Sequence, residues 1–264
     1  MRDGHIHTHF CPHGTKDSFQ QYIEKALKLG YKEISFTEHA PLPKNFNDPV
    51  PTKDSSMSYQ TLEVYLQELV KIKNEYSGQL IINKGLEVDY IEGFEGEIHD
   101  FLNDYGPELD DSILSVHFVK HENSYGCIDY SPEVFAEMVK QYHSTEAIYE
   151  RYYETMVKSV LADLGRYKPK RIGHMTLVHK FQRKFPVTRN FTPEIANLLK
   201  MINKNGYELD YNGAGVAKSL CQEPYPPTSI VDIANEMGIP LIYGSDAHQA
   251  KDLNQGKEFM KISN

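Results

Sequence analysis

Several features that would mark a particular class of protein are scarce or missing in this chain of 264 residues. It has no tryptophan and only three cysteines, and it carries 28 lysines and arginines against 37 aspartates and glutamates, a net charge of −9. A general nucleic-acid binder needs a basic face for the phosphates, so we expect no nucleic-acid partner. No stretch approaches the roughly 18 apolar residues of a membrane span, so we expect no membrane partner either.

The N-terminus and the cysteines indicate a compartment. The first 14 residues hold four histidines where a secretory signal peptide would need an unbroken apolar run. The cysteines are Cys11, Cys127 and Cys221, an odd number at wide spacing with no C-x-x-C pair. Reduced thiols and a cytoplasmic location are therefore predicted. Nothing in the sequence indicates an oligomeric state.

Short β-rich apolar runs alternate with longer amphipathic segments along the chain. The predicted strands are residues 2–6, 32–37, 79–88, 112–117, 170–174, 207–211 and 239–244. The predicted helices are residues 18–29, 59–75, 96–102, 132–165, 192–205 and 228–237. Such alternation implies parallel βα units, and seven or eight such units in about 250 residues suit a closed barrel better than an open sheet. We therefore predict one α/β TIM-like barrel domain over residues 1–264, with a long loop at 41–58 that has the length of a lid or binding loop.

The twelve histidines are the unusual part of the composition. His5 and His7 are two residues apart on an extended segment, so both side chains point to one face and can bind one cation. Further ligand-type side chains occur at or just past predicted strand ends: His39, Glu87, His117, His174, Asp246 and His248. The carboxyl ends of barrel strands meet on the face where active sites are built. Any one of these histidines alone is more often a hydrogen-bonded structural residue, but the series predicts a metal site at the barrel mouth.

Six short motifs follow one another from Asp3 to His248: D-G-H-I-H-T, F-T-E-H, G-L-E-V-D, S-V-H, G-H and G-S-D-A-H. In this order they resemble the PHP (polymerase and histidinol phosphatase) superfamily. The stretches H-T-H-F-C-P-H-G and G-H-M-T-L-V-H-K-F are similar to its monofunctional histidinol-phosphate phosphatases. The resemblance covers essentially the whole chain. It implies a distorted (β/α)7 barrel that holds three divalent metal ions, for which Zn, Mn and Fe are all suitable.

The resemblance also implies which residues bind each metal. Carried over motif by motif, the ligands are His5, His7, Glu87 and Asp246 for one metal, Glu87 again with His117 and His174 for a second, and His13, His39 and His248 for the third. Every one of these positions holds a side chain that can bind a divalent cation.

Three divalent cations beside two carboxylates would leave a local charge of about +4, which attracts a phosphate ester although the chain as a whole is acidic. The predicted reaction is attack at phosphorus by a hydroxide that bridges two metals, with Glu87 setting their spacing. Asp246 and His248 would orient the nucleophile or handle the proton of the leaving alkoxide. Arg151, Lys180 and Arg183 are predicted to bind the substrate phosphate, although each is equally well explained as a solvated helix charge.

The sequence thus predicts a metal-dependent phosphomonoesterase that hydrolyses L-histidinol phosphate, a small-molecule substrate. Three alternatives stay open: a PHP phosphoesterase for nucleotide, sugar or oligonucleotide phosphates, a non-enzymatic PHP-like module of a larger assembly, and an amidohydrolase-type barrel, which shares an early H-x-H. Tyr152 and Tyr153 could pack on a substrate imidazole, and Cys11 is predicted to be a small packed residue. His9 is left open, and the remaining histidines are expected to be structural or on the surface: His99, His121, His143 and His179.

Overall fold

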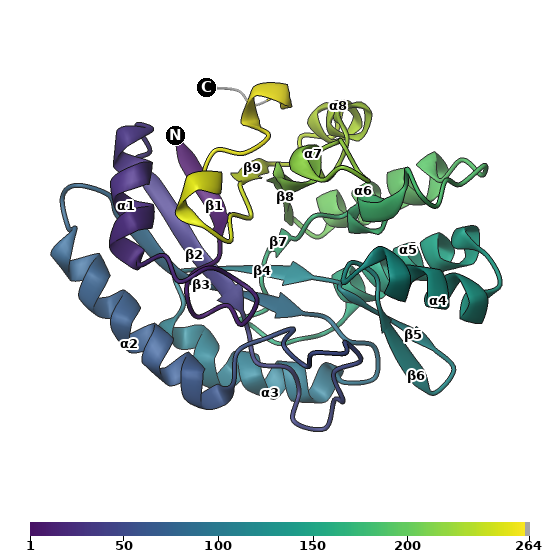
Figure 1. Cartoon of the computed structure of the whole chain (residues 1–264), viewed down its shortest axis with the longest axis horizontal. Coiled ribbons are helices and arrows are strands. Elements are labelled where there is room, and N and C mark those ends of the chain that lie inside the picture. The colour runs from purple at the N-terminus through teal and green to yellow at the C-terminus, as the bar shows by residue number, and fades with distance from the viewer. Residues whose placement is uncertain (262–264) are drawn as a thin grey trace.

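The computed structural model describes residues 1–261 and contains one seven-stranded sheet in the order β1-β2-β3-β4-β7-β8-β9 (Figure 1). Its strands are β1 (Arg2–Ile6), β2 (Glu33–His39), β3 (Ile81–Asp89), β4 (Asp111–Ser115), β7 (Arg171–Ile172), β8 (Glu208–Asn212) and β9 (Leu241–Gly244). Every neighbouring pair is parallel. All seven predicted strands are confirmed, although β7 is shorter than residues 170–174.

The two edges of the sheet approach each other and nearly close a barrel. The Asp246 N–H donates to the carbonyl of His5 at 2.8 Å, and the His7 N–H donates to the carbonyl of Ala247 at 3.0 Å. An isolated parallel bridge between Ile6 and Ala247 completes this join. The predicted distorted (β/α)7 barrel is therefore confirmed, and the join carries predicted ligands from both ends of the chain.

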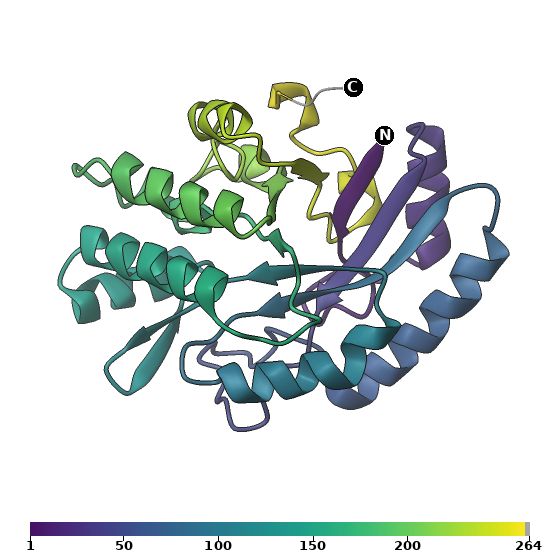
Figure 2. The same ribbon diagram turned by 180° about the vertical axis from the view of Figure 1, so that it is seen from behind.

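Helices cover the outer face of the sheet (Figures 1 and 2). They are α1 (Phe19–Lys28), α2 (Tyr59–Glu75), α3 (Glu95–Tyr105), α4 (Pro132–Tyr142), α5 (Thr145–Leu161), α6 (Thr192–Lys204), the short α7 (Ala214–Ala217) and α8 (Thr228–Glu236). Serine side chains accept the free N–H groups at the first turn of α1, α2, α4 and α5. These caps fix where each helix begins and so how the connecting loops reach the barrel mouth.

The single helix predicted over residues 132–165 is wrong. Helix α4 ends at Tyr142 because His143 takes a left-handed conformation with φ of 70°, and Ser144 then caps the new helix α5. A hairpin of β5 (Phe118–His121) and β6 (Ser124–Cys127) was not predicted; it pairs antiparallel beside the main sheet.

At the amino-terminal end of the barrel a buried arginine joins several strands. The Arg171 guanidinium pairs with Asp111, donates to Glu208 Oε1 at 3.0 Å and donates to the carbonyl of Gly4 at 2.6 Å. Gly4 has no room for a side chain, since a Cβ there would lie 2.5 Å from an Arg171 nitrogen. This end is therefore a structural clasp, opposite the predicted metal site.

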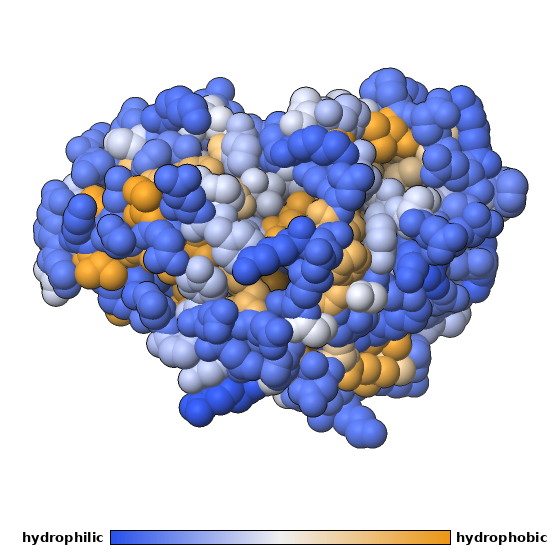
Figure 3. All heavy atoms as spheres, turned by 90° about the horizontal axis from the view of Figure 1, so that it is seen from below, coloured by the Kyte–Doolittle hydropathy of each residue, from blue (hydrophilic) through white to orange (hydrophobic). Residues whose placement is uncertain are grey.

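The view in Figure 3 shows a largely hydrophilic surface in which hydrophobic side chains appear as separate patches. Within residues 1–261, none of the helices combines the length and the apolar character that crossing a bilayer requires. All three cysteines are buried and free, as predicted.

Candidate metal centre

The carboxyl ends of the strands gather the predicted ligands around one cavity of about 370 Å³. His39 and Glu87 lie at or near the ends of β2 and β3, and His5 lies in β1 with His7 and His13 in the segment after it. The remaining ligands follow β4, β7 and β9 within a few residues. Seven of the predicted ligands line this cavity: His13, His39, Glu87, His117, His174, Asp246 and His248. The other two, His5 and His7, are fully buried beside it.

One group of ligand atoms centres on the H-x-H pair. The Nε2 atoms of His5 and His7 are 3.1 Å apart, and Glu87 Oε2 lies 3.4 Å and 3.5 Å from them. Asp246 Oδ1 lies 3.2 Å from the Nε2 of His7 and 3.8 Å from that of His5. These four side chains form the first predicted ligand set, and the fold brings them together from β1, β3 and the segment after β9.

A second group shares Glu87 through its other oxygen. Glu87 Oε1 lies 2.9 Å from His174 Nε2 and 3.7 Å from His117 Nε2. The same oxygen accepts a hydrogen bond from the Ser115 hydroxyl at 2.6 Å, which fixes the carboxylate between the two groups. This is the second predicted set, with Glu87 placed as a bridge.

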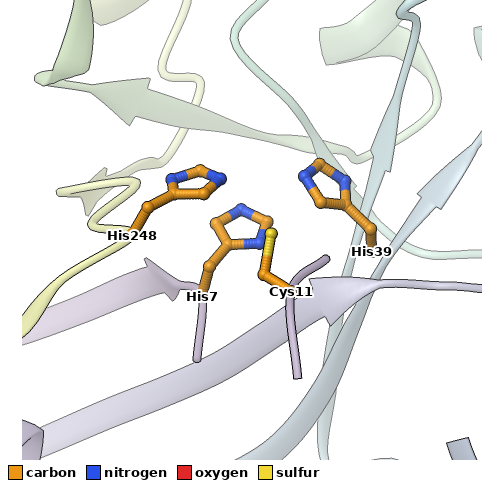
Figure 4. A group of neighbouring side chains, drawn as sticks. All are labelled: His7, Cys11, His39 and His248. Carbon is orange, nitrogen blue, oxygen red and sulfur yellow. The ribbon is translucent and has the colours of Figure 1, made fainter. Parts of the chain in front are cut away.

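The third group differs in part from the prediction. Ligand atoms of His7, Cys11, His39 and His248 lie within 4.8 Å of one another, and Figure 4 shows these side chains pointing toward one another. His13, which was predicted here, has its ring centre 5.2 Å from those of both His39 and His248. The fold therefore gathers all three predicted histidines and adds the Cys11 sulfur to their surroundings.

Oxygen acceptors behind the histidines determine which ring nitrogen faces inward. The Nδ1–H groups of His5, His7 and His117 donate to Asp210, Glu38 and Asp89 at 2.8, 3.0 and 2.7 Å, and that of His13 donates to the carbonyl of Asp54 at 3.0 Å. Such bonds fix the tautomer and raise the basicity of a metal-binding imidazole. These carboxylates were not predicted from the sequence. Glu38 in F-T-E-H and Asp89 in G-L-E-V-D lie inside motifs that contain predicted ligands. Their position next to those ligands was the signal that could have identified them.

The donor set of the H-x-H group fits a cation. Because Nδ1 of His5 and of His7 each carries the proton given to a carboxylate, both Nε2 atoms are bare acceptors, and they face each other across 3.1 Å. The nearest carboxylate oxygens, from Glu87 and Asp246, are acceptors too. His39 Nδ1 is buried without a hydrogen-bond partner, 3.1 Å from Glu87 Oε2. Cations would satisfy the lone pairs that face one another in this group, which a hydrogen bond between two acceptors cannot do.

The electrostatics of the centre favour positive charge. Burial disfavours the charged form of Glu87, but His5, His117 and His39 outweigh it and hold the pKa of Glu87 well below its ordinary value. Burial likewise opposes charging of His7, but bonds to Asp246 and Glu38 raise its pKa to about 9. The carboxylates thus stay ionised and attract either protons or a metal onto the imidazoles.

Of the three predicted substrate-binding cations, only Lys180 lines the cavity, where its Nζ lies 2.9 Å from Asp129 Oδ2. Arg151 is held outside the cavity lining by Glu92 at 3.0 Å and by the carbonyl of Lys120 at 2.8 Å. Arg183 bonds to Gln222 on the exposed surface. Lys218, which was not predicted, is an exposed cation at the cavity.

The structure places the remaining candidates outside the cavity lining. The Tyr152 hydroxyl donates to the carbonyl of His174 at 3.3 Å, and Tyr153 is hydrogen-bonded to His179 Nε2 at 3.0 Å, so both rings are committed to packing. His179 is therefore a structural histidine. His9 packs against Phe10 with ring centres 4.4 Å apart and is outside the cavity lining. The loop at 41–58 does reach the cavity, through Val50, Asp54 and Ser55.

The PHP domain family model matches residues 3–214 of this chain. The chain belongs to the PHP family. This PHP chain is 50% identical over 259 residues to the histidinol-phosphatase of Bacillus subtilis (strain 168), and the match covers 97% of each protein.

Two solved structures share the architecture of this PHP chain. A Listeria monocytogenes protein described as a candidate histidinol phosphatase is 40% identical with a TM-score of 0.93, covering 98% of this chain and 99% of that one. The histidinol phosphate phosphatase of Lactococcus lactis, solved with zinc, L-histidinol and phosphate, has a TM-score of 0.72 at 19% identity and covers 98% and 92%. At 19% identity the likeness concerns the fold alone.

Proposed function

We propose that this PHP chain is a metal-dependent phosphomonoesterase that hydrolyses L-histidinol phosphate to L-histidinol and phosphate. The observation that carries the proposal is the cluster of imidazole and carboxylate acceptors around Glu87, which calls for cations at the mouth of the barrel. Full-length similarity to a curated histidinol-phosphatase at 50% identity supports the substrate. The PHP assignment also sets the chain apart from amidohydrolase-type barrels.

We propose three divalent ions, drawn from Zn, Mn and Fe, held by the ligand sets predicted from the sequence. The groups around His5 and His7 and around His117 and His174 share Glu87, whose two oxygens face different groups. His13, His39 and His248 would hold the third ion. The zinc in the Lactococcus lactis structure supports a metal of this type for the family.

Bound divalent ions would lower the pKa of a coordinated water and neutralise the phosphoryl oxygens. The chain itself supplies the positions. Glu87, held by Ser115, fixes the spacing of two ligand groups, while Asp246 lies between His7 and the open cavity and is oriented by a hydrogen bond from the Asn212 amide at 3.2 Å. Lys180 and Lys218 bring positive charge to the cavity wall for the phosphate.

We propose that His248 acts as a ligand. Its Nδ1–H donates to the carbonyl of Asp246 at 3.1 Å, so its Nε2 is a free acceptor, and its ring stacks on that of His7 with centres 4.1 Å apart. Asp246 is therefore the better candidate for steering the proton of the leaving alkoxide, since one carboxylate oxygen faces His7 and the other accepts only the Asn212 amide.

The test is phosphate release from protein whose metal content has been measured. L-Histidinol phosphate is compared with a nucleotide, a sugar phosphate, p-nitrophenyl phosphate, a phosphodiester and a short oligonucleotide. We expect kcat/KM for L-histidinol phosphate to exceed the others by at least about tenfold. A preference for a nucleotide, sugar or oligonucleotide would favour the other PHP phosphoesterase activity. Fewer than two metals per chain, or no turnover of any ester by metal-loaded protein, would refute the proposal.

Variants of the ligands sharpen this test. Glu87→Gln and His174→Ala should abolish turnover while the circular dichroism spectrum keeps its folded form. Glu137→Gln, on the exposed surface of α4, removes the same charge far from the ligand groups and should leave turnover unchanged. Near-normal activity of the Glu87 variant would rule out its role as a bridge.

A further inference from the structure

The cavity wall contains a charged pair that the metal centre does not use. Asp129 follows strand β6, and Lys180 lies in the short 3-10 helix Leu177–Phe181 that follows β7. Lys180 Nζ lies 2.9 Å from Asp129 Oδ2, and both residues line the cavity with their side chains about one fifth exposed. The Cys127 thiol donates to the other oxygen, Oδ1, at 3.3 Å. The carboxylate is thus held firmly with one edge toward the ligand space.

A carboxylate at this place works against the phosphate. Holding a charge partly out of water has a free-energy cost, and a negative group in the wall repels a phosphate dianion. Two other cavity-lining carboxylates outside the proposed ligand set have tasks of their own. Asp89 accepts the Nδ1–H of His117 at 2.7 Å, and Asp54 belongs to the 41–58 loop, where its side chain bonds to Thr52. Asp129 bonds to neither a ligand histidine nor that loop.

The organic half of the proposed substrate supplies the matching charge. L-Histidinol phosphate is the phosphate ester of a β-amino alcohol, so it carries a primary ammonium on the carbon next to the ester carbon. That ammonium is fully charged at neutral pH, whereas a free imidazole is mostly neutral. Lys180 already shows how a primary ammonium fits, because its own ammonium nitrogen lies 2.9 Å from Asp129. Asp129 therefore occupies a place where the cationic part of such a substrate is recognised.

We propose that Asp129 is a specificity residue that binds the ammonium of a β-amino alcohol phosphate, with Lys180 as the counter-ion that orients it. This inference rests on the proposed function and adds to it the chemical class of the substrate. In the substrate-free protein Lys180 neutralises Asp129. With substrate bound, the incoming ammonium takes a share of the carboxylate, and Lys180 is left free to pair with the phosphate, so that both charges of the substrate meet an opposite charge.

The experiment compares L-histidinol phosphate with 3-(imidazol-4-yl)propyl phosphate, which keeps the imidazole and the ester but lacks the ammonium. The measured quantity is the ratio of the two kcat/KM values on one metal-loaded preparation, because this ratio cancels the fraction of active enzyme. We expect the wild-type ratio to be about 10 to 100, the size of one hydrogen bond between charged groups. In Asp129→Asn it should fall toward about 1 through loss of activity on L-histidinol phosphate only.

Glu133→Gln is the matched control. Glu133 lies in the first turn of α4, four residues from Asp129, and its side chain is exposed. This variant loses the same formal charge and should keep the wild-type ratio.

Each other outcome is informative. A wild-type ratio near 1, or a ratio unchanged by Asp129→Asn, would overturn the assignment of Asp129 while leaving the phosphatase activity standing. If Asp129→Asn lowers kcat/KM equally for both imidazole esters but spares p-nitrophenyl phosphate, Asp129 recognises the imidazole and the ammonium assignment is wrong. Absence of turnover with both esters and with p-nitrophenyl phosphate in the wild type would instead overturn the proposed function.

Discussion

Replacing Glu38 by glutamine tests the idea that buried carboxylates set the histidine tautomers. Glu38 is fully buried and receives four hydrogen bonds. Oε1 accepts from His7 Nδ1 at 3.0 Å and from the His39 N–H at 3.1 Å, and Oε2 accepts from the Thr8 N–H at 2.9 Å and the Thr8 hydroxyl at 2.8 Å. A glutamine presents an NH₂ group on one side. In either orientation of the side-chain amide, the NH₂ group faces a backbone N–H, which can only donate a hydrogen bond and so loses its acceptor.

The magnitude follows from this geometry. Glu38→Gln keeps two of the four bonds at best, and each bond to a charged acceptor is worth about 1.5–3 kcal/mol, so we expect a loss of at least about 3 kcal/mol in metal-free protein. For a chain of this size that corresponds to a fall in Tm of about 6–12 °C. If the NH₂ group faces His7, it donates to Nδ1 and moves the imidazole proton to Nε2, where the cation should bind. If the NH₂ group faces Thr8 instead, His7 donates to a neutral carbonyl and loses basicity, so in either orientation metal affinity should fall, by about 10- to 100-fold.

Two measurements check this prediction. Thermal unfolding of the metal-free protein reports the stability loss, and competition with a chromophoric chelator reports metal affinity. Glu68→Gln, on the partly exposed face of α2, is the control for removing a carboxylate elsewhere. A Glu38→Gln variant with wild-type metal affinity would refute the claim that this carboxylate fixes the ring of His7, even if the protein is less stable.

Two further predictions concern the clasp and the cysteine near the third ligand group. Arg171→Met should lower the free energy of unfolding by about 3–5 kcal/mol in chemical denaturation, since it leaves Asp111 with Arg2 as its remaining cation and removes the donor to the Gly4 carbonyl; a loss below about 1 kcal/mol would show that the clasp is dispensable. Cys11→Ala should keep the full metal content and change kcat by less than about threefold, at a stability loss of about 1 kcal/mol for the small cavity. Loss of one metal equivalent on elemental analysis would instead make Cys11 a ligand.

The sequence predicted the site residues that lie at strand ends. It did not predict where the side chains of helical residues lie, because that depends on how each helix packs. Strand ends locate His39, Glu87, His117 and His174 because parallel strands must meet at one edge. The position of Arg151 is not constrained in this way. It lies on α5, and which way that helix presents it depends on packing and on the break at His143, which the sequence pattern of residues 132–165 did not reveal. Lys180 reached the cavity because it follows a strand end closely.

The carboxylates found behind the histidines change the charge balance expected at the mouth of the barrel. With only Glu87 and Asp246 considered, three divalent ions leave a charge of about +4. Three more buried carboxylates bind the histidines directly: Glu38, Asp89 and Asp210. Counting these, the surplus falls to about +1, which a phosphate dianion more than neutralises. Lys180 and Lys218 are then needed in the wall to balance the bound substrate. Part of the net charge of −9 thus belongs to the metal centre. When the metals are removed, the raised pKa values of His5, His7 and His117 let protons offset three of the five carboxylates, so the centre changes from about +1 to about −2 and should no longer attract phosphate.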